Sequence, residues 1–219
     1  MPLIYLAPFK AVTNVGPVPT DTRLLMHFDG VNNGTIFTDE CGNPQGSYSN
    51  VKTSTTQSKF GGSSLRCDVG SVIMPTTTIG TKDFTIEMWI MFDSVSGTQI
   101  FYDQRYGNGG TAPCLFWNGS TFTWWFAGGA RFTGGTVTPN TWTHLAMSRT
   151  NNILRGFVNG IVVGTYTEPT ASSGDTSISI AGYFSPASFP FKGYIDELRV
   201  CHNGLYTENF SPPTAPFTL

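Results

Sequence analysis

Asp196 is the residue whose chemistry departs furthest from that of an ordinary β-protein. It lies in the segment Phe-Lys-Gly-Tyr-Ile-Asp-Glu-Leu-Arg-Val at 191–200. A strand alternates its side chains between two faces, so this segment predicts Asp196 in one row with Tyr194 and Leu198. A carboxylate in an apolar row costs free energy unless a cation, hydrogen-bond donors or solvent compensate it. Asp196 is therefore a candidate metal ligand, and the alternative is that it accepts backbone N–H groups or pairs with an arginine such as Arg23.

A second group of residues, gathered around one turn, is suited to ligand binding. Aromatic faces match the apolar C–H surface of sugars, and amides match sugar hydroxyls. Trp124 and Trp125 are adjacent in one expected strand and point to opposite faces, so at most one of them belongs to the core. The alternative is that all of these aromatics only pack against one another. The candidate glycan-binding residues are Tyr102, Tyr106, Trp117, Asn118, Trp124 and Trp125.

The carboxylates are not arranged for catalysis. Glycoside hydrolysis uses two carboxylates that flank the scissile bond. Glu87 is the only carboxylate within the expected strand 84–92, and Asp93 follows it out of phase. Asp196 and Glu197 are adjacent, so a regular strand points them to opposite faces. The three histidines are far apart in sequence, and no glycine-rich loop opens a helix. We therefore expect a protein that is not an enzyme and place a glycoside hydrolase third among its possible functions.

Short apolar runs separated by turn residues predict the elements that hold these side chains. Gly, Asn and Pro interrupt runs rich in β-branched and aromatic residues, and no run has a helical period. About a dozen antiparallel strands of this kind predict an all-β, two-sheet antiparallel β-sandwich. Residues 32–50 are rich in turn residues, so we expect no strand there. The main expected strands span 23–30, the part of 60–68 that follows the double glycine, 84–92, 99–104, 114–118, 121–127, 142–149, 153–158, 161–166, 177–181 and 191–200.

Composition excludes several classes of protein. The chain has 219 residues, 12% charged residues and a formal net charge of −2, so it predicts one domain with no basic patch for nucleic acid. No run reaches transmembrane length and no signal peptide is evident, so we expect synthesis and folding in a cytoplasm and no membrane insertion. The four cysteines form no C-x-x-C pair, which argues against zinc. They are interpreted as small buried residues or as members of one or two disulfides.

Residues 1–22 predict an extended N-terminal arm, followed by a β-sandwich domain at 23–219. Four prolines in this segment exclude a helix or a central strand. Its apolar residues Ile4, Tyr5, Leu6 and Phe9 make it too apolar for a free solvated tail. We therefore expect the arm to lie on a surface, either that of its own domain or that of a partner.

The order of landmarks along the chain resembles the concanavalin A-like lectin/glucanase superfamily, in its laminin-G-like and pentraxin-like branch. The resemblance covers about residues 23–217, and the ending at 204–217 is similar to copies of this domain in bacteriophage structural proteins and bacterial surface proteins. The landmarks are Leu-Met-His-Phe-Asp-Gly at 25–30, Ser-Lys-Phe-Gly-Gly-Ser-Ser-Leu at 58–65, Asp-Phe-Thr-Ile-Glu-Met-Trp-Ile at 83–90, Trp-Thr-His-Leu-Ala at 142–146, Phe-Val-Asn-Gly at 157–160 and Gly-Tyr-Ile-Asp-Glu-Leu-Arg-Val at 193–200.

This resemblance implies a jelly roll of two curved sheets, a concave face that often binds glycans, and one structural Ca²⁺ on the convex side. The calcium ligands of the family map onto Asp196 by its carboxylate, Asp29 or Gly30 from the first strand, and Gly62 by its carbonyl. Calcium prefers hard oxygen ligands, and backbone carbonyls are common among them.

Two functions are compatible with these features. The first is a non-enzymatic virion structural protein, a bacteriophage capsid decoration or tail-appendage subunit displayed on the virion surface after synthesis in the host cytoplasm. Its arm and proline-rich tail would hold it to other virion proteins or to copies of itself. The alternative is a carbohydrate-binding adhesin or receptor-binding module, on a virion, on a bacterial cell surface or outside the cell, with cell-surface glycans as partners.

Overall fold

A computed structural model describes residues 16–76, 78–105, 110–172, 176–183 and 188–219. These residues form thirteen β-strands and no helix, and so no helix that could cross a membrane. The strands are β1 (Thr22–Met26), β2 (Tyr48–Ser54), β3 (Ser64–Pro75), β4 (Phe84–Phe92), β5 (Gln99–Asp103), β6 (Cys114–Trp117), β7 (Phe122–Phe126), β8 (Gly129–Gly134), β9 (Thr143–Thr150), β10 (Ile153–Val158), β11 (Ile161–Thr167), β12 (Ser177–Ile180) and β13 (Gly193–Cys201).

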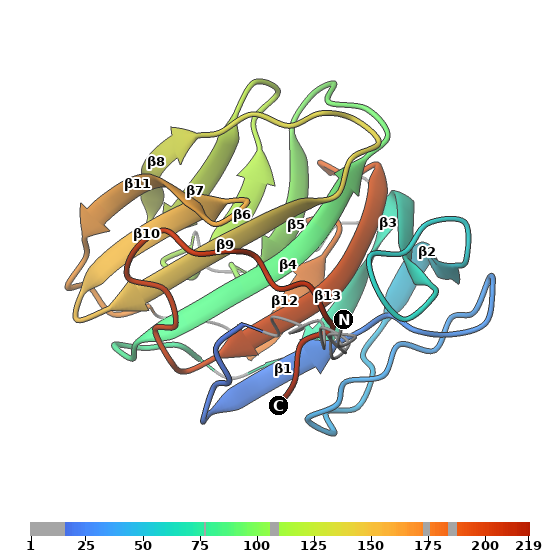
Figure 1. Cartoon of the computed structure of the whole chain (residues 1–219), viewed down its shortest axis with the longest axis horizontal. Coiled ribbons are helices and arrows are strands. Elements are labelled where there is room, and N and C mark those ends of the chain that lie inside the picture. Colours follow the sequence, from blue (N-terminus) through green and yellow to red (C-terminus); the bar gives the residue numbers. More distant parts are fainter. Residues whose placement is uncertain (1–15, 77, 106–109, 173–175, 184–187) are drawn as a thin grey trace, which may run out of the picture.

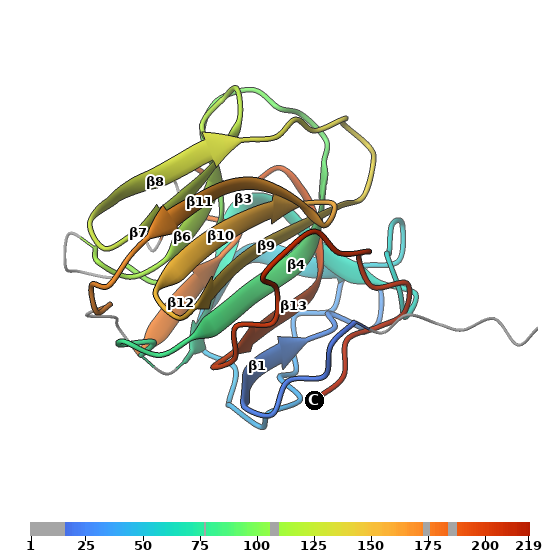
Figure 2. The ribbon, with the colours of Figure 1, turned by 60° about the vertical axis from the view of Figure 1, so that its left-hand side comes forward.

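The strands form two antiparallel layers that one long strand joins (Figure 1). One layer has the order β11-β10-β9-β4-β13, with β1 beside β13, and the other has the order β3-β12-β5-β6-β7-β8, with β2 beside β3. The first part of β3 pairs with β13 and its last part pairs with β12, so β3 passes from one layer to the other. At the far side β8 lies next to β11 (Figure 2). The predicted all-β sandwich is confirmed.

The core between the layers is rich in phenylalanine. Phe92 of β4 lies 5.5 Å from Phe101 of β5 and 5.1 Å from Phe191, measured between ring centroids. Phe84 stacks on Phe126 of β7 at 5.5 Å. All nine residues of β4 are buried, which agrees with a strand that is apolar on both faces and covered on each side.

A β-bulge in β13 corrects the predicted arrangement of its side chains. The register shifts between Asp196 and Arg199, and Glu197 has a positive φ of 53°. The extra residue changes the alternation, so Ile195 and Leu198 both face the core. Asp196 does not share a row with Leu198. It pairs instead with Trp89 on the outer face of the layer, where a loop covers it.

Two strands, β2 and β8, were not expected from the sequence. Both are edge strands, since β2 pairs only with β3 and β8 only with β7 among the described residues. Their sequences, Tyr-Ser-Asn-Val-Lys-Thr-Ser and Gly-Ala-Arg-Phe-Thr-Gly, carry few apolar residues because an edge buries less side-chain surface. Hydrophobic alternation was therefore too weak to predict them.

The proline-rich C-terminal segment packs on its own domain. It crosses the outer face of β9 and β4 in both ribbon views (Figures 1 and 2). Tyr206 and Phe210 stack on each other and contact Phe157 of β10. The described part of the N-terminal arm joins this layer: the backbone N–H groups of Thr20 and Asp21 donate to Asn203 Oδ1.

Candidate functional site

The structure places three of the predicted glycan-binding aromatics in the core. Tyr102 and Trp124 have no exposed surface, and Trp117 is 4% exposed. The indole N–H of Trp124 donates to Ala146 O at 2.9 Å, and that of Trp117 donates to Val95 O at 2.9 Å. The prediction that these three side chains contribute to a binding surface is wrong, because their strands turn them toward the opposite sheet.

The three remaining residues of the predicted glycan-binding group differ in their surroundings. Asn118 is exposed, but its Oδ1 accepts the backbone N–H groups of Ser120 and Thr121, so the side chain closes the turn between β6 and β7. Tyr106 lies outside the described residues. Trp125 is the one member of the described group that is partly exposed on the outer face of its sheet.

Trp125 lines a groove on the outer face of β5, β6 and β7. Strand alternation explains it: Leu115 and Trp124 face the core as a pair, while their neighbours on β6 and β7 face outward. Ile100 and Phe116 are directly opposite each other in the register and continue the same outer row. The groove has a volume of about 230 Å³ and is lined by Thr98, Ile100, Arg105, Phe116, Trp125 and Phe189.

An ion pair fixes the polar end of this groove. The fully buried Asp103 accepts Arg105 Nε at 2.8 Å on Oδ1 and Arg105 Nη2 at 2.7 Å on Oδ2. Burial alone would lower the pKa of Arg105, but the bonds to Asp103 outweigh it and raise that pKa. The guanidinium lies 5.1 Å from the Trp125 ring centroid, and the Trp125 N–H donates to Gly110 O at 2.9 Å. The indole is therefore held from two sides before any ligand arrives.

Phe189 completes the groove from a loop. Its side chain is 52% exposed, and its φ of 54° lies in the left-handed region that a bulky residue rarely adopts. Its carbonyl accepts the N–H of Ile100 at 3.0 Å, which ties the loop to β5. Sequence reasoning missed Arg105, Phe116 and Phe189. The outward alternation of Phe116 was a usable signal, but nothing in the sequence brings Phe189 to β5.

Asp196 lies in a second site, under the loop before β3. Its Oδ2 accepts the backbone N–H groups of Lys59 at 2.7 Å and Phe60 at 3.2 Å. Its Oδ1 is buried and has no hydrogen-bond partner among the described residues. Burial, together with the negative charges of Glu197 and Asp29, raises the pKa of Asp196 to about 8 despite the two backbone bonds. Arg23, the alternative partner, pairs with Asp21 instead.

Asp29 approaches the same loop from the chain that follows β1. A Cβ added to Gly61 would lie 2.1 Å from both carboxylate oxygens of Asp29, and Gly61 has a φ of +64°. Only glycine therefore permits this approach. The N–H of Gly30 donates to Ser63 Oγ at 2.8 Å, which holds the two segments together. Asp196, Asp29 and the Gly61-Gly62 pair, far apart in sequence, thus converge.

The sequence of residues 68–208 matches a laminin-G family model described as the concanavalin A-like lectin/glucanases superfamily. The chain belongs to this superfamily. A search of curated proteins found no match.

Solved structures with the same superfamily fold share little sequence with the chain. Domain 4 of AbnA, a GH43 extracellular arabinanase from Geobacillus stearothermophilus solved in complex with arabinotriose, aligns with a TM-score of 0.62 and 18% identity over 85% of this chain and 95% of that chain. The binding domain of botulinum neurotoxin serotype D aligns with a TM-score of 0.62 and 10% identity over 85% of this chain and 49% of that chain. A structure of botulinum neurotoxin type C, a toxin whose cell entry depends on interaction with two ganglioside molecules, aligns with a TM-score of 0.60 and 13% identity. That alignment covers 85% of this chain and 49% of the neurotoxin chain. The chain thus spans about half of the neurotoxin structures.

The calcium site implied by membership of the concanavalin A-like superfamily fits the residues present. Asp196 Oδ1 is a buried anionic oxygen that lacks a partner, and Asp29 brings a second carboxylate to the same loop. Within the described ranges, no group of three or more His, Cys, Asp or Glu side chains could hold a metal. An ion here would therefore need backbone carbonyls, such as that of Gly62, or water as further ligands.

The best catalytic candidate on this lectin-like fold is sequestered. Glu87 is fully buried, and its Oε1 accepts Arg199 Nε at 2.9 Å and Nη2 at 2.6 Å. Its Oε2 accepts Tyr206 Oη at 2.8 Å and lies 3.2 Å from His144 Nε2. Burial alone would raise the pKa of Glu87, but Arg199 and His144 lower it below the ordinary value. Both oxygens are occupied, and the tail covers them, so Glu87 cannot reach a substrate.

Proposed function

We propose that this chain is a non-catalytic carbohydrate-binding module and that the groove at Trp125 holds a sugar. The observation that carries the proposal is a partly exposed indole, fixed by Arg105 and Gly110, at the centre of an apolar groove. Similar folds solved with arabinotriose, or linked to ganglioside-dependent cell entry, support this function class.

The groove favours a neutral sugar ring. Trp125, Phe116 and Phe189 offer aromatic carbon to the C–H face of a sugar, and Thr98 offers a hydroxyl. The charge of Arg105 is balanced by Asp103, so the described residues that line the groove include no free cation that would select an acidic sugar. At about 230 Å³ the groove is smaller than the roughly 300–1,000 Å³ of drug-sized pockets. It therefore suits one ring or a chain end.

A glycan array followed by titration calorimetry tests this proposal. Trp125→Ala removes the central aromatic, and because such anchors typically contribute about 2 kcal/mol or more, affinity should fall about 30-fold or more. Tyr166→Ala, at an aromatic that is 42% exposed outside the groove, is the matched control and should bind as the parent does. An array without any bound glycan, or unchanged affinity of Trp125→Ala, would remove the proposal.

We further propose one structural Ca²⁺ at Asp196, with Asp29, Gly30 or Gly62 as further ligands. The unpartnered Asp196 Oδ1 supports it, because a buried anionic oxygen without a donor is costly. The ion would neutralise this carboxylate and join β13 to the loop before β3.

A virion structural role remains a second, compatible proposal. The arm supports it: the described sandwich is complete without residues 1–15, yet these include the apolar Ile4, Tyr5, Leu6 and Phe9, which lie outside the described residues. A capsid decoration or tail-appendage subunit would use them to bind other virion proteins or copies of itself. Deletion of residues 1–20 should then abolish incorporation into the parent particle. Unchanged incorporation would show that the arm is not the anchor.

A further inference from the structure

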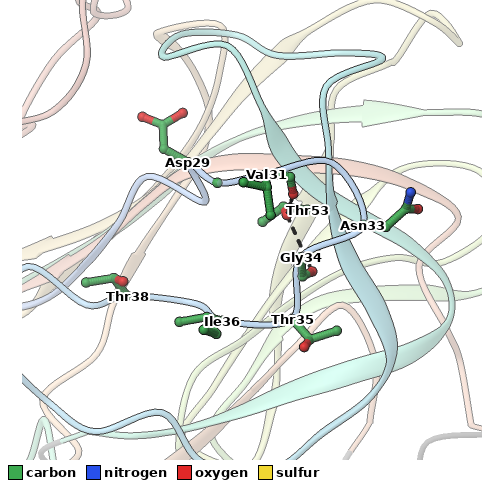
Figure 3. A pocket seen from close by; sticks show the side chains of 9 residues that line it. Asp29, Val31, Asn33, Gly34, Thr35, Ile36, Thr38 and Thr53 are labelled. Carbon is green, nitrogen blue, oxygen red and sulfur yellow. Dashed lines mark hydrogen bonds between the residues drawn. The ribbon is translucent and has the colours of Figure 1, made fainter.

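A hollow of about 560 Å³ lies between β2, β3 and the loop 29–38, and we call it the Tyr48 hollow. Its volume falls within the roughly 300–1,000 Å³ of small-molecule pockets. It adjoins a hollow of about 440 Å³ between Thr53 and the same loop, and the two share Asn33 and Thr35 (Figure 3). It shares no lining residue with the Trp125 groove. The polar side chains that line it belong to Asn33, Thr35, Asn50, Lys52, Arg66 and Asp68.

The pairing of β2 with β3 shifts its register at this hollow. Residues 68–70 of β3 lie opposite Asn50 of β2 alone. Asn50 has a φ of 50°, in the left-handed region that asparagine tolerates better than most residues. A Cβ added to Gly70 would lie 1.7 Å from Ser49 O, so only glycine permits this approach of the two strands. Such bulges re-aim side chains, and here Asn50 and Asp68 both line the hollow.

The Tyr48 hollow contains a cation and an anion that do not pair with each other. Lys52 and Asp68 are exposed, and neither side chain forms an ion pair or hydrogen bond within the described residues. Arg66 lies directly opposite Lys52 in the register, but its Nη1 donates to Asp93 Oδ2 at 2.5 Å. The charge of Arg66 is therefore balanced. The two unpaired charges sum to zero, so the hollow does not select a ligand of either sign.

Tyr48 gives the hollow an aromatic surface. Its side chain is 45% exposed, and its ring meets the buried Phe37 ring edge-on, at 5.8 Å between centroids. The guanidinium of Arg66 lies 4.7 Å from the Tyr194 ring centroid, and this contact and the bond to Asp93 hold it in place. An aromatic ring packs well against the C–H face of a sugar. These contacts hold Tyr48 and Arg66 before any ligand arrives.

The polar groups match a ligand that is rich in hydroxyls. A sugar hydroxyl both donates and accepts hydrogen bonds, so it can donate to the Asp68 carboxylate and accept from the Lys52 ammonium. The side-chain amides of Asn33 and Asn50 can each donate and accept as well. An acidic ligand would be repelled by Asp68 and a basic one by Lys52. A neutral ligand therefore fits best.

We propose that the Tyr48 hollow is a second glycan-binding site, which holds more than one ring of a neutral oligosaccharide. Its volume is more than twice the 230 Å³ of the Trp125 groove, which suits one ring or a chain end. The inference rests on the proposed function, because it adds a site for the same class of ligand. The two sites share no lining residue, so each can be removed without the other.

Glycan arrays probed with the parent, Tyr48→Ala, Trp125→Ala and the double variant test the proposal. Trp125→Ala should still bind neutral oligosaccharides, and the added Tyr48→Ala should abolish that binding. If Trp125→Ala bound none of the parent's glycans, or if the double variant still bound them, the second site would be wrong. If Tyr48→Ala alone abolished all binding, the second site would stand and the proposal for the Trp125 groove would fail. A parent that binds no glycan would exclude both.

Titration calorimetry in the Trp125→Ala background then measures the contribution of Asp68, with the neutral oligosaccharide that this variant binds best on the array. Asp68→Asn should weaken binding about 10-fold or more, the usual effect of losing a hydrogen bond to a charged group. The Asp68 side chain has no partner in the described fold, so its replacement should leave stability unchanged. Glu208→Gln, at an exposed carboxylate outside the hollow, is the matched control and should not weaken binding. Equal affinities of Asp68→Asn and Glu208→Gln would overturn the proposal.

Discussion

At the scale of single residues, Asp196 couples the stability of the domain to pH. Its pKa rises from 3.8 to about 8 on folding, so the folded state binds this proton more tightly than the unfolded chain does. The stabilisation that the folded state gains from this proton is complete below about pH 4 and is lost as pH rises toward 8. In chelator, the free energy of unfolding should therefore fall across this window.

Urea denaturation of the parent and of Asp196→Asn in chelator, from pH 5 to 8, measures this effect. The variant has no titratable group at this position, so its free energy of unfolding should change less with pH than that of the parent. Equal slopes for the two proteins would show that Asp196 does not titrate in this range.

Bound calcium should offset the free-energy cost of burying the ionised Asp196 carboxylate. At pH 8, millimolar Ca²⁺ should raise the Tm of the parent by several degrees over chelator, because an ion bound only by the folded state stabilises it. Gly61→Ala should abolish that response, since its Cβ would displace the Asp29 carboxylate. Gly42→Ala is the matched control: Gly42 also has a positive φ, of +81°, but nothing lies within 4 Å of its Cβ. A parent Tm that is the same in Ca²⁺ and chelator would contradict a stabilising ion.

At the scale of elements, the C-terminal segment closes one face of the sandwich through buried polar contacts. Arg199 donates to Glu87, and through Nη1 to Thr218 O at 3.2 Å and through Nη2 to Pro17 O at 3.3 Å, so both described ends of the chain meet one guanidinium. Glu197 Oε2 accepts the N–H of Phe217 at 2.7 Å. Polar residues of β4, β9 and β13 are buried here because the tail covers them and brings donors.

Tyr206→Phe should therefore destabilise the domain while it preserves the ring contacts of the tail. The substitution leaves Glu87 Oε2 without its hydroxyl donor in a fully buried site, at a cost of about 1–3 kcal/mol. For a domain of this size the Tm should fall by roughly 2–4 °C for each kcal/mol. Tyr166→Phe, at an exposed ring, should change Tm little. Equal Tm values for the two variants would show that the buried hydroxyl contributes nothing.

At the scale of the whole molecule, the proposed glycan groove and the proposed calcium site belong to different parts of the sandwich. The Trp125 groove lies on the outer face of β5, β6 and β7, whereas the calcium candidate Asp196 lies on β13, under the loop that precedes β3. An ion at Asp196 would therefore leave the groove free for a glycan.

The amino-acid sequence by itself determined the class of fold and most of its strands. Segments such as 84–92 and 153–158 alternate or concentrate apolar residues strongly enough to require a strand, and turn residues separate them. The family landmarks also singled out Asp29, Gly62 and Asp196 as calcium candidates, and the structure brings Asp29 and Asp196 to the loop that contains Gly62. The edge strands β2 and β8 were missed because little of their surface is buried.

Only the tertiary structure decided which side chains are available to a ligand. Strand alternation placed Trp124 and Trp125 on opposite faces, but only the position of the second sheet made Trp124 the core residue and Trp125 the exposed one. The bulge at Glu197 moved Asp196 to the outer face, and the folding back of the tail buried Glu87. These outcomes depend on contacts between residues far apart in the chain, and local sequence pattern carries no record of such contacts.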